Sequence, residues 1–367
     1  MKIMSTPRDL DLSITGRCNL RCAYCSHFTS ASDVDNDLPA EEWLDFFSEL
    51  GRCSVMSVTL QGGEPFCRDD FREIVLGIIR NRMRFSILSN GTLITDDLAS
   101  FLAETGRCDN VQVSIDGSTP VTHDAFRGNG SFKKAVRGIE YLQKHRVPVS
   151  ARVTVHKRNV RELGKIARML LEDMGIRSIS TNSAAHMGLC RFSAEQIQLS
   201  VEEKALAMKV LLELDLKYPG LISATAGPLA DGKTWIAMEK ARVEGKETIP
   251  GRGCLSGCGA TMSQLAVRAD GVIVPCSQLS HIELGRINQV DLKELWLNHP
   301  ELKRLRERYK IALTDFPACR DCVYVRYCTG NCPALSYTYS GNYCEPSPDA
   351  CLRRFLEKGG QLPVRIE

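Results

Sequence analysis

The chain has 367 residues, with 47 Lys and Arg against 44 Asp and Glu, and a formal net charge of +3. This slight charge gives no argument for nucleic acid or a membrane surface as a partner. The first residues, MKIMSTPRDLDLSI, lack the apolar core of a signal peptide, and no apolar run approaches the length of a membrane span. We expect a cytoplasmic globular protein of two or three lobes.

Residues 10–182 alternate strand-like and helix-like runs. Helices are predicted where apolar residues recur at i, i+3, i+4 and i+7, as Trp43, Phe46, Phe47 and Leu50 do. Six such β/α units predict a parallel sheet with right-handed crossovers and functional residues at the carboxyl ends of its strands. The predicted strands are Leu10–Thr15, Ser57–Leu60, Arg84–Ser89, Asn110–Ile115, Val149–Val155 and Arg177–Thr181, and the predicted helices are 40–51, 70–81, 96–105, 131–146 and 160–174.

The rest of the chain is less regular. Residues 183–250 contain a helical pattern around Val201–Leu216 and a Gly- and Pro-containing stretch near 219–232, and we expect a connecting or substrate-facing region. From about residue 251 the chain is rich in cysteines and turns, as in a small lobe held together by clusters. The predicted domains are 1–182, 183–250 and 251–367.

The chain contains 16 cysteines, which fall largely in two groups with short spacings. Disulfides are not expected in a reducing compartment, so the spacing favours metal or cluster ligation. In the first group, Cys18, Cys22 and Cys25 form CxxxCxxC directly after the first predicted strand. Three thiolates can hold three irons of a 4Fe-4S cube, whereas electron-transfer clusters are closed by four cysteines. The fourth iron is then open to a small molecule.

A second motif, Gln61-Gly62-Gly63-Glu64-Pro65, directly follows the second predicted strand. Alone, it predicts only a turn in which glycines permit unusual φ angles or a close approach of the backbone to a ligand. Because the carboxyl ends of parallel strands meet at one edge, it is expected beside the three cysteines.

With both motifs at one rim, the chain resembles the radical S-adenosylmethionine (SAM) enzymes, in which the open iron binds the amine and carboxylate of SAM. The resemblance implies a partial (β/α)6 TIM-like barrel and reductive cleavage of SAM to a 5′-deoxyadenosyl radical that takes a hydrogen atom from substrate. Simple turn capping is the alternative for Asn90 and Asp116. The implied SAM-binding residues are Tyr24, Gly62, Gly63, Glu64, Pro65, Asn90, Ser114, Asp116 and Arg152.

The second cysteine group resembles the SPASM extension of radical SAM enzymes, which carries two auxiliary 4Fe-4S clusters. Zinc is the structural alternative, since paired cysteines make good tetrahedral sites. Cys351 is preferred to Cys344 as the last ligand because the stretch 346–351 looks like the family's closing segment. By resemblance, one cluster takes Cys254, Cys258, Cys276 and Cys332, and the other takes Cys319, Cys322, Cys328 and Cys351.

Three further features bear on the reaction. Cys190 follows the sixth predicted strand, where by resemblance to peptide epimerases its thiol would return a hydrogen atom to substrate; the alternative is a buried core cysteine. Formylglycine-forming relatives carry Asp after the cysteine that matches Cys276, whereas this chain has Ser277, a poor base. About nine residues precede the first strand, so no leader-binding module is expected there, and a separate recognition protein or the 183–250 region would bind a peptide.

The sequence therefore predicts a radical SAM/SPASM enzyme with three 4Fe-4S clusters and SAM that modifies a ribosomally made peptide by crosslinking, epimerisation or a related reaction. An electron donor such as flavodoxin or ferredoxin is implied as partner. The first alternative is a radical SAM enzyme acting on a small metabolite or cofactor precursor. A non-catalytic polyferredoxin-like electron carrier is a remote alternative, because a carrier gains nothing from an open iron.

Overall fold

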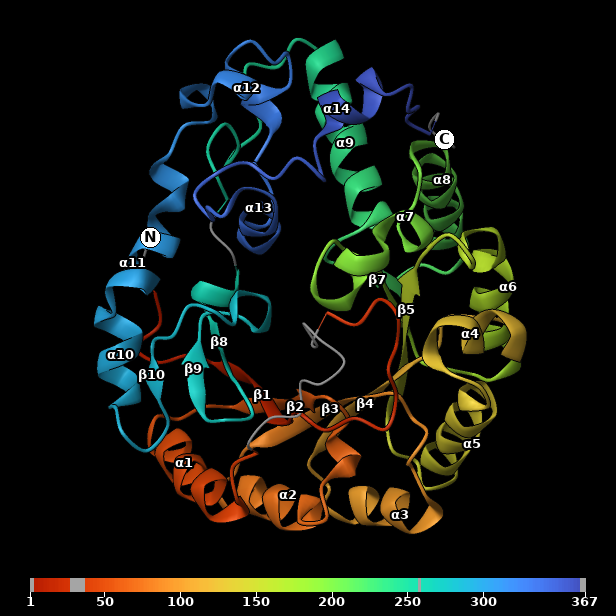
Figure 1. Ribbon diagram of the computed structural model, residues 1–367, viewed down its shortest axis with the longest axis vertical. Helices are drawn as coiled ribbons and strands as arrows, with labels where there is room; N and C mark the ends of the chain where they lie inside the picture. The colour runs from red at the N-terminus through yellow and green to blue at the C-terminus, as the bar shows by residue number, and fades with distance from the viewer. Residues whose placement is uncertain (1–2, 27–36, 257–258, 364–367) are drawn as a thin grey trace. The chain divides into compact units, whose positions relative to one another are not determined.

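The computed structural model describes residues 3–26, 37–256 and 259–363 (Figure 1). The chain divides into two compact units. The first comprises Met1–Arg152 and Gly259–Arg304, and the second comprises Val153–Cys258 and Leu305–Glu367. Across the described ranges, no helix has both the length and the apolar character that crossing a membrane requires.

The first unit is built on a mainly parallel sheet with the strand order β10-β9-β8-β1-β2-β3-β4-β5. Strands β1 to β5 pair in parallel in chain order, which confirms the predicted α/β fold. Only the first four residues of β5 belong to this unit, since the strand continues into the second. The bounds of these strands are Asp9–Thr15 for β1, Ser57–Gly62 for β2, Arg84–Ser89 for β3, Cys108–Ser114 for β4 and Val149–Val155 for β5.

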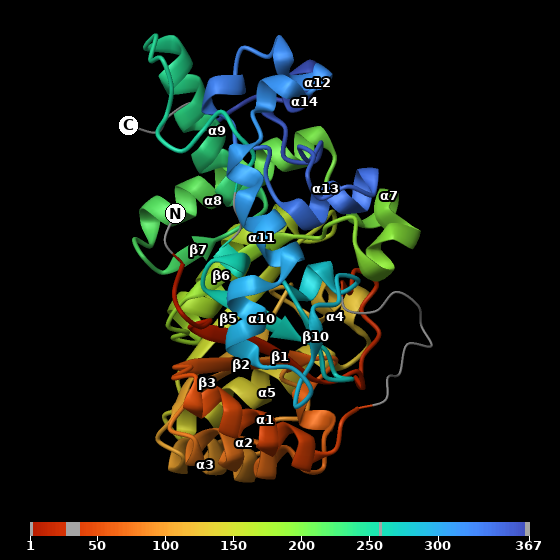
Figure 2. The same cartoon turned by 90° about the vertical axis from the view of Figure 1, so that its left-hand side faces the viewer.

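Helices α1 (Ala40–Arg52), α2 (Phe71–Arg80) and α3 (Asp96–Glu104) lie side by side on one face of this sheet (Figures 1 and 2). Burial of alternate strand residues explains the arrangement, since Leu10 and Leu12 of β1 are fully buried while Asp9 and Asp11 are only partly buried. The unit also contains α4 (Pro120–Arg127) and α5 (Ser131–Lys144). The alternation leaves the polar residues on the opposite face of the sheet.

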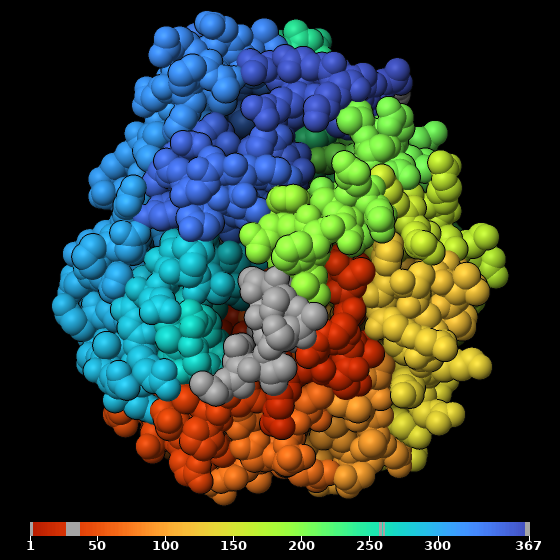
Figure 3. All heavy atoms as spheres, in the orientation of Figure 1, coloured from red at the N-terminus to blue at the C-terminus, as the bar shows by residue number. Residues whose placement is uncertain are grey.

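The first unit also contains strands that the sequence pattern does not predict, because each has four residues or fewer. Strand β8 (Gln264–Val267) pairs in parallel with β1, and β9 (Val272–Val274) and β10 (Gly285–Arg286) follow in antiparallel pairing. Beyond them, α10 (Leu292–Asn298) lies beside α1, and the backbone N–H of Leu292 donates to Glu49 at 2.8 Å. Figure 3 shows the blue and cyan atoms of this segment against the orange-red atoms of α1.

The second unit is mostly helical around the short parallel pair β6 (Ile179–Ser183) and β7 (Ile222–Ala224). Its core joins two long helices to the cysteine-rich segment through Met208, Trp235, Tyr324 and Phe355. The helices are α6 (Leu163–Arg168), α7 (Ala194–Ile197), α8 (Val201–Lys217), α9 (Pro228–Val243), α12 (Pro317–Arg320), α13 (Pro333–Ser340) and α14 (Leu352–Glu357), and α11 (Pro300–Arg306) runs across the boundary between the units.

Two expectations differ from the structure in this unit. The helix predicted over 160–174 is divided into a 3-10 turn, the short α6 and a π-helical turn at Met169–Asp173. The stretch near 219–232 holds β7 and the start of α9, because Pro228 occupies the first turn of a helix, where its missing N–H costs nothing. Helix α8 begins as its sequence indicates, with a capping box between Ser200 and Glu203.

Candidate functional site

The loops that follow β1 and β2 are joined by backbone hydrogen bonds. The N–H of Gly63 donates to the carbonyl of Thr15, and the N–H of Glu64 donates to the carbonyl of Arg17, both at 2.8 Å. A Cβ on Gly62 would lie 2.2 Å from the Thr15 oxygen, and a Cβ on Gly63 would lie 2.1 Å from the Arg17 oxygen. The two glycines are therefore required for the contact between the loops, whatever they do for a ligand.

Glu64 is fully buried and connects the β2 loop to the end of β3. Its carboxylate accepts from the Ser89 hydroxyl at 2.8 Å and from the backbone N–H of Asn90 at 2.7 Å. Burial raises the pKa of Glu64 to about 7, and these hydrogen bonds oppose the rise. Pro65 begins a 3-10 turn directly after it. A ligand that bound to the Glu64 carboxylate would share it with the hydrogen bonds from Ser89 and Asn90.

The three cysteines of the first group lie together after β1. Burial raises the pKa of the Cys18 thiol to about 12 and that of Cys22 to about 11, and the neighbouring thiols of the group contribute in the same direction. The amide of Asn90 is 3.9 Å from the Cys18 sulfur and donates to Asn19 at 2.9 Å. Three adjacent thiols are a suitable donor set for an iron-sulfur cluster with one open iron.

Beside the cysteines lies a buried polar group that the sequence only partly predicts. The Tyr24 hydroxyl donates to Asp116 Oδ2, and Arg127 Nε donates to the same oxygen at 2.5 Å. Burial raises the pKa of Tyr24 well above its usual range, and Asp116 acts in the same direction while Arg127 opposes it. Ser114 ends β4 and is paired in register with Arg152 of β5. Burial lowers the pKa of Arg152, and the charge of Asp116 opposes this change.

Arg127 was not predicted as a site residue. It ends α4 and is followed by Gly128 with φ 116°, so in the sequence it has the features of an ordinary helix end. Only the tertiary fold, which brings the end of α4 against the cysteine loop, places it here.

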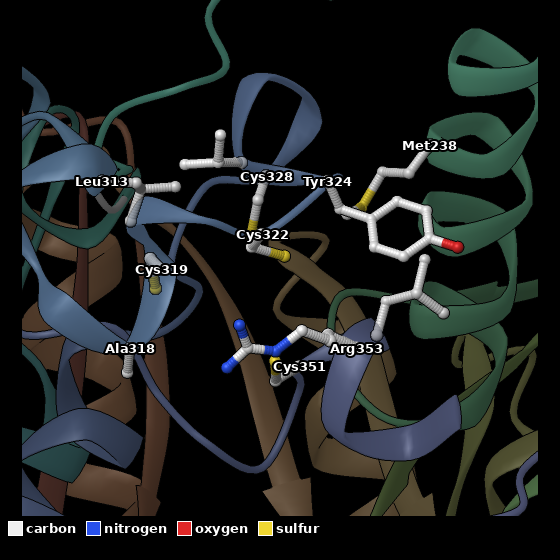
Figure 4. Close-up of a pocket in the computed structure, with 11 residues that line it drawn as sticks. Met238, Leu313, Ala318, Cys319, Cys322, Tyr324, Cys328, Cys351 and Arg353 are labelled. Atoms are coloured by element: carbon white, nitrogen blue, oxygen red, sulfur yellow. The ribbon is translucent and has the colours of Figure 1, made fainter. Parts of the chain in front are cut away.

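In the second unit, Cys319, Cys322, Cys328 and Cys351 line one pocket (Figure 4). Burial raises the pKa of Cys319 to about 11, with further increases from the other three thiols. Four thiols around one pocket form the usual donor set of a closed 4Fe-4S cluster. Cys344 is not among the described residues that line this pocket, and its backbone N–H donates to Asn342 at 2.9 Å. The geometry thus agrees with the preference for Cys351, whose role as ligand stays a prediction.

The other predicted auxiliary group is less complete in the structure. In the second unit, the backbone of Cys254 pairs with that of Ala312 in an isolated antiparallel β-bridge. Cys332 precedes α13 and is exposed. Cys276 belongs to the first unit and precedes a turn that includes Ser277, while Cys258 lies outside the described residues. The ligand role of these four cysteines therefore stays a prediction.

Two observations concern the alternatives. Within the described residues, no three His, Cys, Asp or Glu side chains form a group that could hold one metal ion. In a 4Fe-4S cube each cysteine sulfur binds a different iron, so the four thiols need not converge on one point.

Cys190 is fully buried, and burial raises the pKa of its thiol to about 11. Its burial agrees with a core cysteine, and the hydrogen-donor hypothesis stays untested.

Comparison with known families decides the class. Residues 12–170 match the radical SAM superfamily, and residues 258–323 match the SPASM family of iron-sulfur cluster-binding domains. The chain is a radical SAM enzyme with a SPASM domain. The radical SAM domain binds a 4Fe-4S cluster and SAM, and the SPASM domain binds auxiliary iron-sulfur clusters. The alternative of a non-catalytic electron carrier is therefore set aside.

Relatives of this radical SAM/SPASM enzyme fall in two substrate classes. An AdoMet-dependent heme synthase of Methanosarcina barkeri is 28% identical over 94% of this chain and 96% of its own length. A PqqA peptide cyclase of Rhizobium meliloti is 22% identical over 86% of this chain and 82% of its own length. The mycofactocin maturase MftC of Mycobacterium tuberculosis is 35% identical over 45% of this chain and 42% of its own length.

Solved structures share the fold. Streptococcus suis SuiB bound to the precursor peptide SuiA has a TM-score of 0.74 and 15% identity, covering 95% of this chain and 77% of that chain. The protein anSMEcpe with bound AdoMet has a TM-score of 0.69 and 20% identity, covering 96% of both chains.

Proposed function

We propose that this radical SAM/SPASM enzyme modifies a ribosomally made peptide by hydrogen-atom abstraction. The observation that carries the proposal is the chemistry of the sheet face opposite α1, α2 and α3. On that face Ser57 donates to Asp9, Thr59 hydrogen-bonds to Asp11, and the Asn110 amide donates to Ser150 at 2.8 Å. This face is rich in hydrogen-bonding groups.

The polar groups on this face suit a peptide substrate, since peptide amides and hydroxyls can exchange hydrogen bonds with them. The peptide-cyclising and maturase relatives and the fold shared with SuiB support the same proposal.

In this proposal the predicted site residues have distinct tasks. Cys18, Cys22 and Cys25 hold the cluster that, with SAM, supplies the hydrogen-abstracting radical chemistry. Backbone and side chains at the ends of β2 to β5 bind and orient SAM, and the second cysteine group holds two auxiliary clusters. The SAM-binding set is Tyr24, Gly62, Gly63, Glu64, Pro65, Asn90, Ser114, Asp116 and Arg152. We also propose a cytoplasmic location, a flavodoxin- or ferredoxin-type electron donor, and the domain boundaries at 182 and 250.

A small cofactor precursor is the second candidate substrate. It is favoured by the heme synthase relative, which aligns over nearly its whole length with this chain.

The test is a pair of anaerobic incubations with SAM and reductant. One contains a short peptide encoded beside the gene, and the other contains Fe-coproporphyrin III. We expect 5′-deoxyadenosine formation to rise with the peptide and the peptide mass to change, while the porphyrin is unaltered. Conversion of the porphyrin with no change in the peptide would contradict the proposal and establish the second candidate.

A further inference from the structure

The end of α4 contacts the cysteine loop at several points. The carbonyl of Phe126 accepts from the backbone N–H of Ala23 at 3.0 Å, and the Phe126 ring meets the Tyr24 ring edge-on, with 6.2 Å between centroids. The Arg127 guanidinium carbon lies 5.5 Å from the centroid of the Tyr24 ring. Two consecutive α4 residues thus pack on the two residues between Cys22 and Cys25.

Burial of the charged Arg127 side chain in this contact is unfavourable for the free energy of folding. Its side chain is 7% exposed, and that of its partner Asp116 is 1% exposed. Burying an ion pair costs several kcal/mol per ion, and well-packed apolar residues often replace such a pair without loss of stability. Stability alone therefore does not account for a guanidinium at this position.

We propose that Arg127 is a positioning residue for the SAM site, which fixes the Tyr24 ring through Asp116. The geometry supports this role, since Tyr24 and Arg127 donate to one oxygen of Asp116. The guanidinium also lies against the Tyr24 ring itself.

The role makes a specific prediction about SAM. Tyr24 and Asp116 are both proposed SAM contacts, and Arg127 contacts both of them. Removal of the guanidinium takes away one donor to the buried Asp116 carboxylate and one contact of the Tyr24 ring. SAM should then bind more weakly even where the cysteines still hold iron.

The experiment measures SAM binding in the holoenzyme without any peptide, so its outcome is independent of the substrate proposal. The variants are Arg127→Gln, Arg127→Lys, Asp116→Asn, Tyr24→Phe and the double variant Arg127→Gln/Tyr24→Phe. The control is Arg84→Gln, which removes a guanidinium that bonds to Asp109 at 2.5 Å on the surface of the same unit. The readouts are iron per chain, the SAM dissociation constant by equilibrium dialysis, and the SAM-induced change in the EPR spectrum of reduced protein.

We expect Arg127→Gln to raise the SAM dissociation constant about tenfold, the equivalent of one charged hydrogen bond, with iron content retained and the SAM-induced EPR change altered. Arg127→Lys should lose only about threefold because it keeps the charge, and the control should match wild type. In the double variant the two losses should be less than additive, because both act through Asp116.

Wild-type SAM affinity and EPR response in Arg127→Gln would overturn the proposal. So would a loss of affinity that only follows a loss of iron. If Arg127→Gln does not fold, Arg127→Lys and Asp116→Asn decide: an unchanged dissociation constant in both would equally overturn it.

Discussion

The cysteine loop of the first unit and the cysteine pocket of the second are built in different ways. In the first unit, hydrogen bonds of the protein itself hold the loop: the Gly63 N–H donates to the Thr15 carbonyl, and the Asn90 N–H donates to the Glu64 carboxylate. In the second unit, the pocket-lining residues Met238 and Tyr324 also belong to the apolar core, and Cys322 and Cys328 pack against it. From this difference we predict that the first loop keeps its structure without a cluster, whereas the second unit depends on one.

The largest effect that would test this comparison is the loss of a pocket thiol. Cys328→Ala should remove cluster binding, and since structural metal sites contribute on the order of 10 kcal/mol to folding, the second unit should lose its protected core. Cys22→Ala should instead leave the fold intact. Hydrogen exchange of each unit measures both, with Cys53→Ala, outside both cysteine groups, as the control. Equal loss of protection in Cys22→Ala and Cys328→Ala would break the comparison.

The next effect concerns the contact between the β1 and β2 loops. A methyl group on Gly63 would meet the Arg17 carbonyl at 2.1 Å, so Gly63→Ala should cost about 3 kcal/mol or more in the free energy of unfolding. Gly164, in α6, has open space around its Cβ position, so Gly164→Ala should be neutral or stabilising by up to about 1 kcal/mol. Denaturant unfolding compares the two, and equal costs would show that the loops are not in close contact.

Glu64 provides a pH test of the same contact. Its pKa is raised to about 7 from 4.5, so the folded state binds its proton more tightly than the unfolded state. Stability from this group is therefore present below about pH 4.5 and is lost as the pH rises towards 7, by about 3 kcal/mol in total. Unfolding of wild type and Glu64→Gln between pH 5 and 8 should show this decline in wild type alone. Parallel pH profiles would exclude Glu64 as its source.

The smallest effect is expected at the edge of the second core. The Tyr324 hydroxyl donates to Glu239 at 2.8 Å, so Tyr324→Phe should cost about 1 kcal/mol and leave cluster binding intact. Tyr309 is 42% exposed, and Tyr309→Phe is the matched control with no expected change. Thermal unfolding and iron content check both. Loss of iron in Tyr324→Phe would mean that the hydroxyl, and not the apolar ring, supports the pocket.

The sequence predicts the regular part of the fold well, because long strands and helices carry periodic patterns. The bounds of β3 and β5 agree with prediction at both ends. Strand β8 is four residues long and pairs with a strand more than 250 residues earlier, which no local pattern can indicate. Arg127 is missed for a related reason, since its partner Asp116 lies outside its helix and only the tertiary fold brings them together.

The central claim is that three cysteines after β1 hold a cluster with an open iron that cleaves SAM. The direct measurement is 5′-deoxyadenosine formed by anaerobically reconstituted, reduced protein. We predict formation by wild type at roughly 12 irons per chain, as three cubes require, and none by the variant with Cys18, Cys22 and Cys25 changed to Ala. No 5′-deoxyadenosine from fully loaded wild type, or equal amounts from both proteins, would contradict the account.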